Sequence, residues 1–272
     1  MQTTISAFYK FVAISDPDAL QTAVAAVGCA NDIKGTILIA REGINATVCG
    51  PDEGVRALLK WLRSDDRFCD LVSKESYAGA PAFRRFKVKV KPEIVTFGHP
   101  EIDPVASVGT YVPPEQWNAL IEEPGVILVD TRNSYEFDIG TFKGAIDPKT
   151  TTFREFPKFV SDELDPARDR KVAMFCTGGI RCEKATAYLR SQGFNDVYHL
   201  EGGILKYLEV VPPSESLWQG ECFIFDNRVA VEHGVKPGRA RLCKKCGFPT
   251  RDAVDEAEIC PKCSGTSAAS AI

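Results

Sequence analysis

The 272-residue sequence has no long hydrophobic run, only three histidines and only two methionines. No stretch approaches the roughly 20 consecutive apolar residues of a membrane-spanning helix. Residues 1–15 also lack the basic region followed by an apolar one that marks a secretory leader. Glycine motifs for nucleotides or flavins are missing as well. We therefore expect a cytoplasmic protein that makes no membrane contact and carries no flavin or nucleotide cofactor.

The scarcity of histidine limits metal chemistry based on imidazole. His99-Pro100-Glu101 has the His-x-carboxylate spacing of a non-haem iron triad, but only His199 and His233, in distant segments, could supply the second histidine. The alternative is a solvated linker, because residues 92–114 contain five prolines and two glycines without helical or strand period. We favour the linker and place it at residues 99–112.

Cysteine is plentiful, with ten residues. A disulfide framework is typical of short secreted chains, whereas six of these cysteines are scattered through apparent strands and helices. The hydrophobic fraction of 44% and the charged fraction of 26% are those of a soluble globular protein. The length suits two domains of ordinary size and a small third one. We expect reduced thiols and one metal site.

The first domain is predicted to span residues 1–98. Hydrophobic patterning indicates strands, helices and strands in the order β-α-β-β-α-β, which is that of a ferredoxin-like sandwich. The expected strands are 9–14, 37–40, 44–49, 68–76 and 83–90, and the expected helices are 16–27 and 52–63.

A basic stripe follows one side of the last of these strands, because its side chains alternate strictly. The stripe consists of Arg85, Lys87, Lys89 and Lys91. It is either a surface for an RNA backbone or a solvated strand face that resists edge pairing. A second basic cluster lies near the C-terminus, where residues 228–251 hold seven Lys or Arg and one Glu. Its candidate RNA contacts are Arg239, Arg241, Lys244 and Lys245.

The second domain is predicted to span residues 113–212 as a parallel α/β sheet. Strands are expected at 126–129, 172–175 and 197–200, and helices at 117–121, 183–191 and 204–208. Cys176 directly follows the middle strand, at the carboxyl end where such sheets place their sites.

The segment that organises the second domain is Cys176-Thr177-Gly178-Gly179-Ile180-Arg181-Cys182. The glycines permit a tight loop whose N–H groups point at the sulfur, and the helix N-terminus and Arg181 favour thiolate over thiol. The alternative, an inert buried cysteine, does not explain the glycine pair and the arginine. Cys182 is either a resolving thiol for Cys176 or a helix residue packed inward.

The arginine follows Cys176 after four residues, one fewer than in the cysteine loop of tyrosine phosphatases, which suits a persulfide better than a phosphate. The loop resembles the active loop of rhodanese-type domains, in the version carried by bacterial tRNA uridine hydroxylases. Asp130-x-Arg132-x3-Glu136-Phe137 and Leu200–Ile204 resemble two further rhodanese signatures, with Thr141 where many rhodaneses have histidine. We interpret the three charged residues as a structural network.

A second segment carries the same resemblance. Residues 40–47, Ala-Arg-Glu-Gly-Ile-Asn-Ala-Thr, resemble a signature of the tRNA hydroxylase family. The resemblance implies that Arg41 and Asn45 lie near the substrate. The alternative is a hairpin turn between two apolar strands.

The tail, residues 213–265, holds two Cys-x2-Cys pairs separated by 13 residues. This spacing is typical of a four-thiolate zinc ribbon, because each pair turns two sulfurs onto one ion. The predicted ligands are Cys243, Cys246, Cys260 and Cys263. Residues 266–272 are expected to be disordered.

The resemblance covers nearly the whole chain and implies oxygen-dependent 5-hydroxylation of the wobble uridine in the tRNA anticodon loop. Molecular oxygen is then a co-substrate, structural zinc is expected in the tail, and no DNA partner is expected. One hypothesis is that Cys176, as thiolate or persulfide, adds to uridine C6. The alternative function is a thiosulfate or persulfide sulfurtransferase that delivers sulfur to RNA or protein. A third class, a non-catalytic RNA-binding adaptor, is disfavoured by the intact Cys176 and Arg181.

Overall fold

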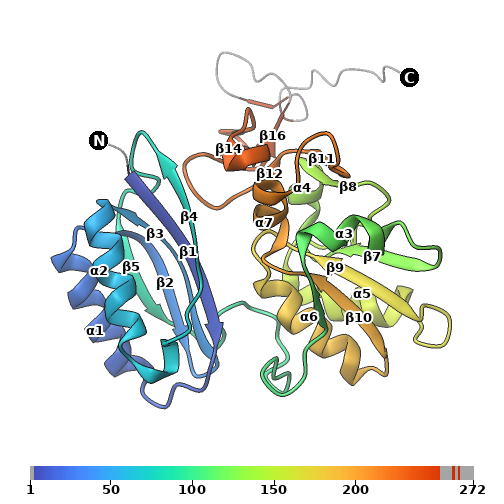
Figure 1. Cartoon of the computed structure of the whole chain (residues 1–272), viewed down its shortest axis with the longest axis horizontal. Helices are drawn as coiled ribbons and strands as arrows, with labels where there is room; N and C mark the ends of the chain where they lie inside the picture. Colours follow the sequence, from blue (N-terminus) through green and yellow to red (C-terminus); the bar gives the residue numbers. More distant parts are fainter. Residues whose placement is uncertain (1–2, 252–258, 261–262, 264–272) are drawn as a thin grey trace. The chain divides into compact units, whose positions relative to one another are not determined.

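The computed structural model describes residues 3–251, 259–260 and 263. The predicted disorder of residues 266–272 therefore lies outside the described residues. The chain divides into two compact units, residues 1–107 and 108–272 (Figure 1). None of the helices in the described ranges is long and apolar enough to cross a membrane.

The first unit has a five-stranded sheet covered on one face by two helices (Figure 1). Strand order is β4-β1-β3-β2-β5, in which β5 pairs parallel with β2 and the other pairs are antiparallel. The first four strands and both helices form the predicted ferredoxin-like sandwich, and β5 adds a fifth strand at its edge. The elements are β1 (Thr3–Phe11), α1 (Pro17–Ala30), β2 (Lys34–Ala40), β3 (Gly43–Gly50), α2 (Asp52–Arg63), η1 (Asp66–Phe68), β4 (Ser73–Ala78) and β5 (Phe86–Val90).

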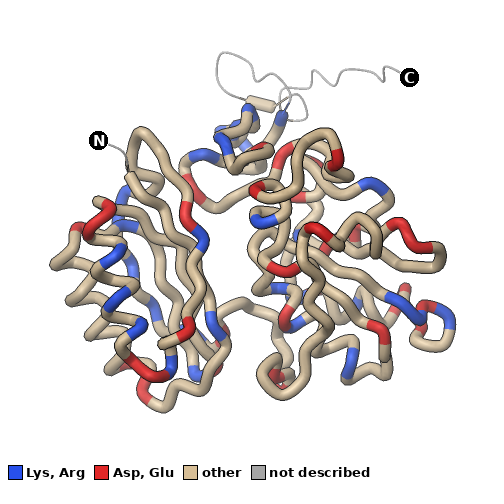
Figure 2. The backbone as a smooth tube through the Cα atoms, viewed as in Figure 1, with Lys and Arg blue, Asp and Glu red and all other residues tan. Residues whose placement is uncertain are grey.

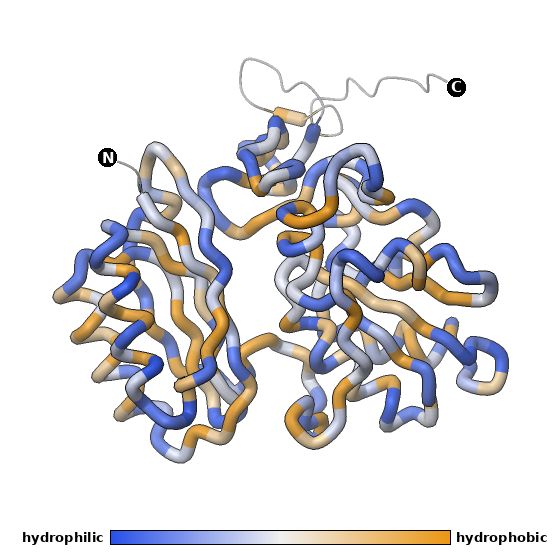
Figure 3. The backbone as a smooth tube through the Cα atoms, viewed as in Figure 1, coloured by the Kyte–Doolittle hydropathy of each residue, from blue (hydrophilic) through white to orange (hydrophobic). Residues whose placement is uncertain are grey.

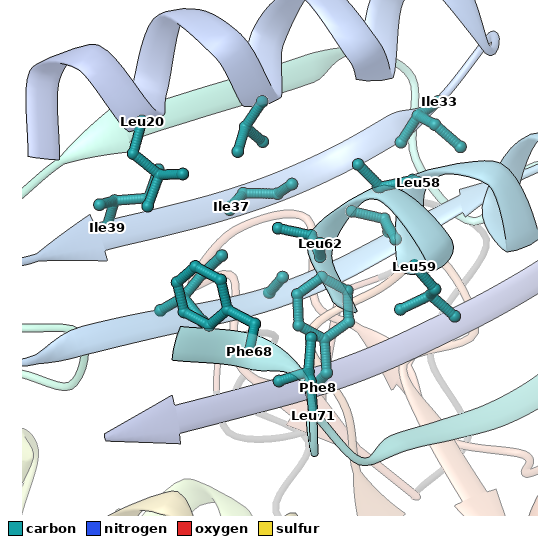
Figure 4. Close-up of a cluster of buried hydrophobic side chains, with 14 of the residues drawn as sticks. Phe8, Leu20, Ile33, Ile37, Ile39, Leu58, Leu59, Leu62, Phe68 and Leu71 are labelled. Carbon is teal, nitrogen blue, oxygen red and sulfur yellow. The ribbon is translucent and has the colours of Figure 1, made fainter. Parts of the chain in front are cut away.

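Helix α2 shows why the core of this unit forms. Its apolar residues recur at helical spacing, and Val55, Leu58, Leu59 and Leu62 are all buried against the sheet. Acidic residues in its first turn and basic residues in its last turn stabilise the helix, because their charges interact favourably with the helix dipole. Figure 4 shows Leu58, Leu59 and Leu62 with other buried side chains of the same core. This core fixes which face of the sheet stays free of helices.

The segment expected as a linker is divided between the two units. Residues 99–107 belong to the first unit, and residues 110–112 form strand β6 of the second. Just before them, Ile94 and Phe97 are fully buried, and the Glu42 side chain accepts a hydrogen bond from the Ile94 N–H at 2.7 Å. Neighbouring prolines conceal these apolar anchors from a search for helical or strand periodicity.

The second unit has a four-stranded sheet in the order β6-β10-β9-β7, whose strands are all parallel, as predicted. Helices α3 and α7 pack together, as do α5 and α6. The structure adds β6, α4, β8 and α5 to the predicted elements. The elements are β6 (Thr110–Val112), α3 (Pro114–Ile121), β7 (Val126–Asp130), α4 (Ser134–Phe137), β8 (Gly140–Phe142), η2 (Phe153–Glu155), α5 (Phe156–Glu163), β9 (Lys171–Phe175), α6 (Ile180–Ser191), β10 (Asp196–Leu200) and α7 (Gly203–Val210).

Strand β9 lies at the centre of this unit. Its residues from Val172 to Phe175 are all fully buried, so both faces of the sheet are covered. Figure 3 shows mostly hydrophobic residues along the central strands of this unit and hydrophilic residues in many of its loops. Helix α6 is buried on every side, from Arg181 to Leu189. The turn between β9 and α6 is therefore held by packing at both ends.

The cysteine-rich segment belongs to the second unit and continues its structure. Strand β11 pairs antiparallel with β8, and three short strands follow as a small sheet. A two-stranded pair then carries the first cysteine pair between its strands. The elements are β11 (Trp218–Gly220), β12 (Cys222–Phe223), β13 (Ala230–Glu232), η3 (His233–Val235), β14 (Lys236–Pro237), β15 (Arg241–Leu242) and β16 (Pro249–Thr250).

Candidate active site

Three adjacent parallel strands end at the same edge of the sheet and build one site there. Strand β7 is followed by Thr131 and α4, β9 by the Cys176 loop, and β10 by a glycine pair that starts α7. The Thr131 N–H and hydroxyl both donate to the carbonyl of Phe175, at 3.0 Å each. These bonds fix the end of β9 immediately before Cys176.

The loop directs backbone N–H groups at the Cys176 sulfur, which is fully buried. The Gly179 N–H donates to Sγ at 3.1 Å, and the backbone N–H of Cys182 donates to it as well. Gly179 has φ of 106°, a conformation that a side chain would disfavour. The predicted cradle of amides around the sulfur is therefore present.

Helix α7 holds the opposite side of the loop. The N–H groups of Ile204 and Leu205 donate to the carbonyls of Cys176 and Thr177, at 3.0 and 3.1 Å. The contact is close because Gly203 has no side chain: a Cβ there would lie 2.5 Å from the Cys176 carbonyl oxygen. The loop carbonyls thus face α7 while its amides face the sulfur. Sequence reasoning missed the role of Gly203, although the signature around it was recognised.

Arg181 is held by a carboxylate that sequence reasoning had assigned to a separate network. Its guanidinium donates two hydrogen bonds to Glu136, at 2.7 and 2.9 Å, and a third to the Thr177 hydroxyl at 3.2 Å. Both ion-pair partners are buried. Burial alone would lower the pKa of Arg181, but the Glu136 carboxylate raises it, so the guanidinium stays charged. Arg181 therefore braces the loop and still places positive charge near Cys176.

The predicted charge network is present: Asp130 and Arg132 pair with each other, and Glu136 joins it through its charge interaction with Arg132. Asp130 and Arg132 form a fully buried ion pair at 2.6 Å, and Arg132 also donates to the Gly140 carbonyl at 2.6 Å. The Thr141 hydroxyl donates to Asp130 at 3.1 Å. Thr141, which replaces the histidine of many rhodaneses, thus helps to hold this pair.

The pKa values of the two loop cysteines are shifted in opposite directions. Burial raises the pKa of the Cys176 thiol, but the hydrogen bond from the Cys182 thiol, the Arg181 charge and the loop amides together lower it to about 5. Burial and the same thiol–thiol contact raise the pKa of Cys182 well above its ordinary value. Cys176 is therefore the thiolate of the pair and Cys182 its hydrogen-bond donor.

The four tail cysteines converge as a candidate metal site. The sulfurs of Cys243, Cys246, Cys260 and Cys263 all lie within 4.8 Å of one another. The Cys260 N–H donates to the Cys243 sulfur at 3.3 Å, a bond that stabilises a metal-bound thiolate. Among the described residues, this is the one group of three or more His, Cys, Asp or Glu side chains whose ligand atoms converge. His99 instead pairs with Glu101 at 2.8 Å, and His199 is buried against Tyr111.

Comparison with known proteins identifies the two units separately. Residues 3–94 match the UPF0176 acylphosphatase-like domain family. Residues 113–209 match the rhodanese-like domain family, which contains the Cys176 loop. The second unit carries a rhodanese-like domain. Its signature loop, the Glu136 segment and the Gly203 segment all lie inside the matched residues.

Several solved structures show distant similarity. A rhodanese-like domain from Anabaena sp. is 22% identical, with 42% of this chain and 80% of that chain covered and a TM-score of 0.34. A protein of unknown function from Rhodopseudomonas palustris, described as a possible tyrosine phosphatase, is 24% identical, with 45% and 98% covered and a TM-score of 0.34. Klebsiella pneumoniae BlrP1 with FMN and cyclic diGMP is 21% identical, with 33% and 26% covered and a TM-score of 0.29. Similarities this weak say nothing about the chemistry of this chain.

The basic stripe of the first unit lies on the helix-free face of the sheet. Lys87 is in register with Thr36 and Lys89 with Leu38, whereas Phe86 and Val88 pack towards the helices. All four cations of the stripe are exposed, as are Arg239, Arg241, Lys244 and Lys245 outside the rhodanese-like domain.

The two residues singled out at the hairpin differ. Arg41 is exposed at the turn between β2 and β3. Asn45 donates its side-chain N–H to the Ile94 carbonyl at 2.9 Å, which ties the following segment to the sheet. The structure thus gives Asn45 a structural partner and leaves Arg41 accessible.

Proposed function

We propose that this protein is a tRNA-modifying enzyme that hydroxylates C5 of the wobble uridine, with molecular oxygen as co-substrate and Cys176 as the reacting group. The observation that carries the proposal is the Cys176 sulfur, held as a thiolate by the Gly179 N–H at 3.1 Å and by the Cys182 thiol. The domain pair supports the choice of substrate, because a UPF0176 acylphosphatase-like domain precedes the rhodanese-like domain. That order is the one implied by the resemblance to tRNA uridine hydroxylases.

In the proposed reaction the Cys176 sulfur forms a bond to C6 of uridine, which moves an electron pair towards C5. One atom of O2 becomes bonded to C5 and the other leaves as water. Two electrons and two protons come from a thiol reductant, which is oxidised to its disulfide. Loss of the C5 proton and cleavage of the C6–S bond then restore the uracil ring and the Cys176 thiolate.

The second candidate function is sulfur transfer from a Cys176 persulfide. Loop amides that point at the sulfur can stabilise negative charge on an outer sulfur, while the carbonyls are held away by α7. An acceptor nucleophile would attack the outer sulfur, break the S–S bond and release Cys176 as a thiolate. Because this leaving group has a low pKa, the transfer is favourable.

We further propose that the tail site holds structural zinc. A tetrahedral ion with Zn–S distances of about 2.3 Å needs sulfurs about 3.8 Å apart, and the four sulfurs lie within 4.8 Å of one another. The residues therefore fit zinc with a small contraction. The ion would supply folding energy to a segment that buries few apolar side chains.

Nucleoside analysis of tRNA from cells that lack the gene tests the proposed function. Loss of 5-hydroxyuridine, restored by the wild-type gene, is expected. Cys176→Ser should fail to restore it, whereas Cys29→Ser, which alters an exposed cysteine of α1, should restore it fully. Loss of a thiouridine instead would favour the sulfurtransferase. Full restoration of 5-hydroxyuridine by Cys176→Ser would exclude Cys176 as the reacting group.

A further inference from the structure

Four aromatic side chains form a continuous ladder across the second unit. Phe248 stacks on Tyr135, with ring centroids 5.5 Å apart and an interplanar angle of 19°. Tyr135 meets Phe223 edge-on at 5.4 Å, and Phe223 meets Phe225 edge-on at 5.0 Å. The ladder joins the metal-binding segment to the first helix of the active site, because Tyr135 lies in α4.

The two ends of the ladder are open to solvent. Phe225 is 62% exposed and Phe248 is 54% exposed, whereas Phe223 between them is 8% exposed. Over the described part of the chain, no other phenylalanine is this exposed. Packing in the protein core therefore explains why Phe223 is aromatic. It does not explain the rings of Phe225 and Phe248, which each keep a face exposed to solvent. Exposed rings with a free face are what unpaired nucleobases stack on.

The segment that carries Phe248 is basic, whereas Phe225 is followed by Asp226, which pairs with Arg228 at 2.6 Å. Residues 228–251 carry seven Lys or Arg and one Glu, and the cations gather on the C-terminal segment in Figure 2. Lys244 and Lys245 are exposed beside Phe248 in the sequence. Lysine is depleted at the cores of protein–protein interfaces, whereas cations around aromatic rings are typical of single-strand nucleic-acid surfaces.

The ladder also touches the catalytic apparatus. Tyr135 directly precedes Glu136, which binds Arg181 at 2.7 and 2.9 Å and accepts from the Thr177 hydroxyl at 3.4 Å. A nucleotide stacked on the ladder would thus lie on the same unit as the Cys176 loop.

We propose that the exposed faces of Phe225 and Phe248 stack unpaired nucleotides of the RNA substrate that flank the target uridine. The inference rests on the proposed RNA substrate and adds the surface that holds it. Stacking recognises any base, so the ladder would contribute affinity and position, while the reactive loop selects the uridine.

The test uses full-length, metal-loaded protein and a fluorescent anticodon stem-loop RNA, with affinity measured by anisotropy at several salt concentrations. Phe225→Leu and Phe248→Leu keep apolar bulk but remove the ring. Each should weaken binding about 5-fold to 150-fold, because stacking is worth roughly 1–3 kcal/mol per base. The dependence of log affinity on log salt should not change, because no cation is removed. Phe248→Trp, which keeps a ring face, should retain wild-type affinity.

Tyr77→Leu is the matched control, since Tyr77 is 50% exposed in the first unit. Its affinity should equal that of the wild type, and metal content should be unchanged in all variants. If both leucine variants bind RNA as tightly as the wild type, the stacking inference is wrong while the proposed function stands. If the wild-type protein itself binds neither this RNA nor a whole tRNA, the proposed RNA substrate fails first.

Discussion

Cys176 and Cys182 are both fully buried, and the interaction between their thiols lowers the pKa of Cys176 and raises the pKa of Cys182. The first consequence is kinetic. Alkylation of Cys176 by iodoacetamide, followed by peptide mass spectrometry, should rise with pH at a midpoint well below the roughly 8.5 of a free thiol. Cys182→Ala should move this midpoint upward, because a donor to the thiolate is lost. An unchanged midpoint would show that the contact does not tune Cys176.

The same shift makes stability depend on pH. The folded-state pKa of Cys176, about 5, lies below the unfolded value of roughly 8.5, so the ionised thiolate stabilises the folded protein above the unfolded pKa. This contribution should be lost progressively as pH falls from about 8.5 towards 5. The free energy of unfolding of the wild type, minus that of Cys176→Ser, should therefore increase between pH 6 and pH 8. A flat difference would contradict the lowered pKa.

Cys182 is also placed to resolve an oxidised Cys176. Limited peroxide or a persulfide donor should yield a Cys176–Cys182 disulfide, seen as a peptide pair that has lost two hydrogens, because a second buried thiol interacts with the reactive sulfur. Cys182→Ala should instead accumulate a sulfenic acid or persulfide on Cys176. Cys222→Ala, which alters another fully buried cysteine, serves as the control and should still form the disulfide. If Cys182→Ala only lowers thermal stability, Cys182 is simply a packed helix residue.

Gly203 is expected to control the shape of the loop. Gly203→Ala introduces a Cβ 2.5 Å from the Cys176 carbonyl oxygen, which should push the loop away from α7 and slow Cys176 alkylation at least tenfold. Gly193→Ala is the matched control, because Gly193 also has positive φ but a Cβ added there would meet no other part of the fold within 4 Å. It should cost only about 1–2 kcal/mol of stability and leave Cys176 reactivity unchanged. If Cys176 is alkylated equally fast in the two variants, Gly203 does not control the shape of the loop.

Patterning predicted the framework of the site better than its contacts. Residues 52–63 were assigned correctly as a helix because four leucine and valine positions repeat at helical spacing. Strand β1 was expected to start at residue 9, but it starts at Thr3. Its first residues were missed because Thr4 and Ser6, on the same face as buried Phe8, are polar and give no hydrophobic alternation. The Cys176 turn was predictable, since the glycine pair that permits it directly follows Thr177 in the sequence. The Glu136–Arg181 pair was not, because it joins residues 45 positions apart.

Salt dependence of tRNA binding should separate the two basic surfaces from ordinary solvated faces. If Lys87 and Lys89 contact phosphates, Lys87→Ala and Lys89→Ala should each lower the slope of log affinity against log salt by about one unit, without changing which uridine is modified. Lys244→Ala should do the same for the tail. Lys34→Ala removes an exposed lysine at the start of β2 and should leave the slope unchanged. Slopes equal to that of the wild type would show that these lysines are solvated and do not contact phosphates.

Metal removal should loosen the tail and spare the rhodanese-like domain. Cys243 and Cys260 belong to a segment whose exposed Leu242 and Phe248 bury too little surface to fold without an ion. Chelation should therefore release zinc, expose the four thiols to a thiol reagent and break the stacking of Phe248 on Tyr135. The main thermal transition should persist, because the cores around Trp117 and Phe175 do not depend on the tail cysteines. Cys246→Ser should reproduce the effect of the chelator, and Cys69→Ser, at an exposed cysteine of the first unit, should not. Protein purified under reduction that holds no metal by elemental analysis, or in which the four sulfurs form disulfides, would contradict the zinc site.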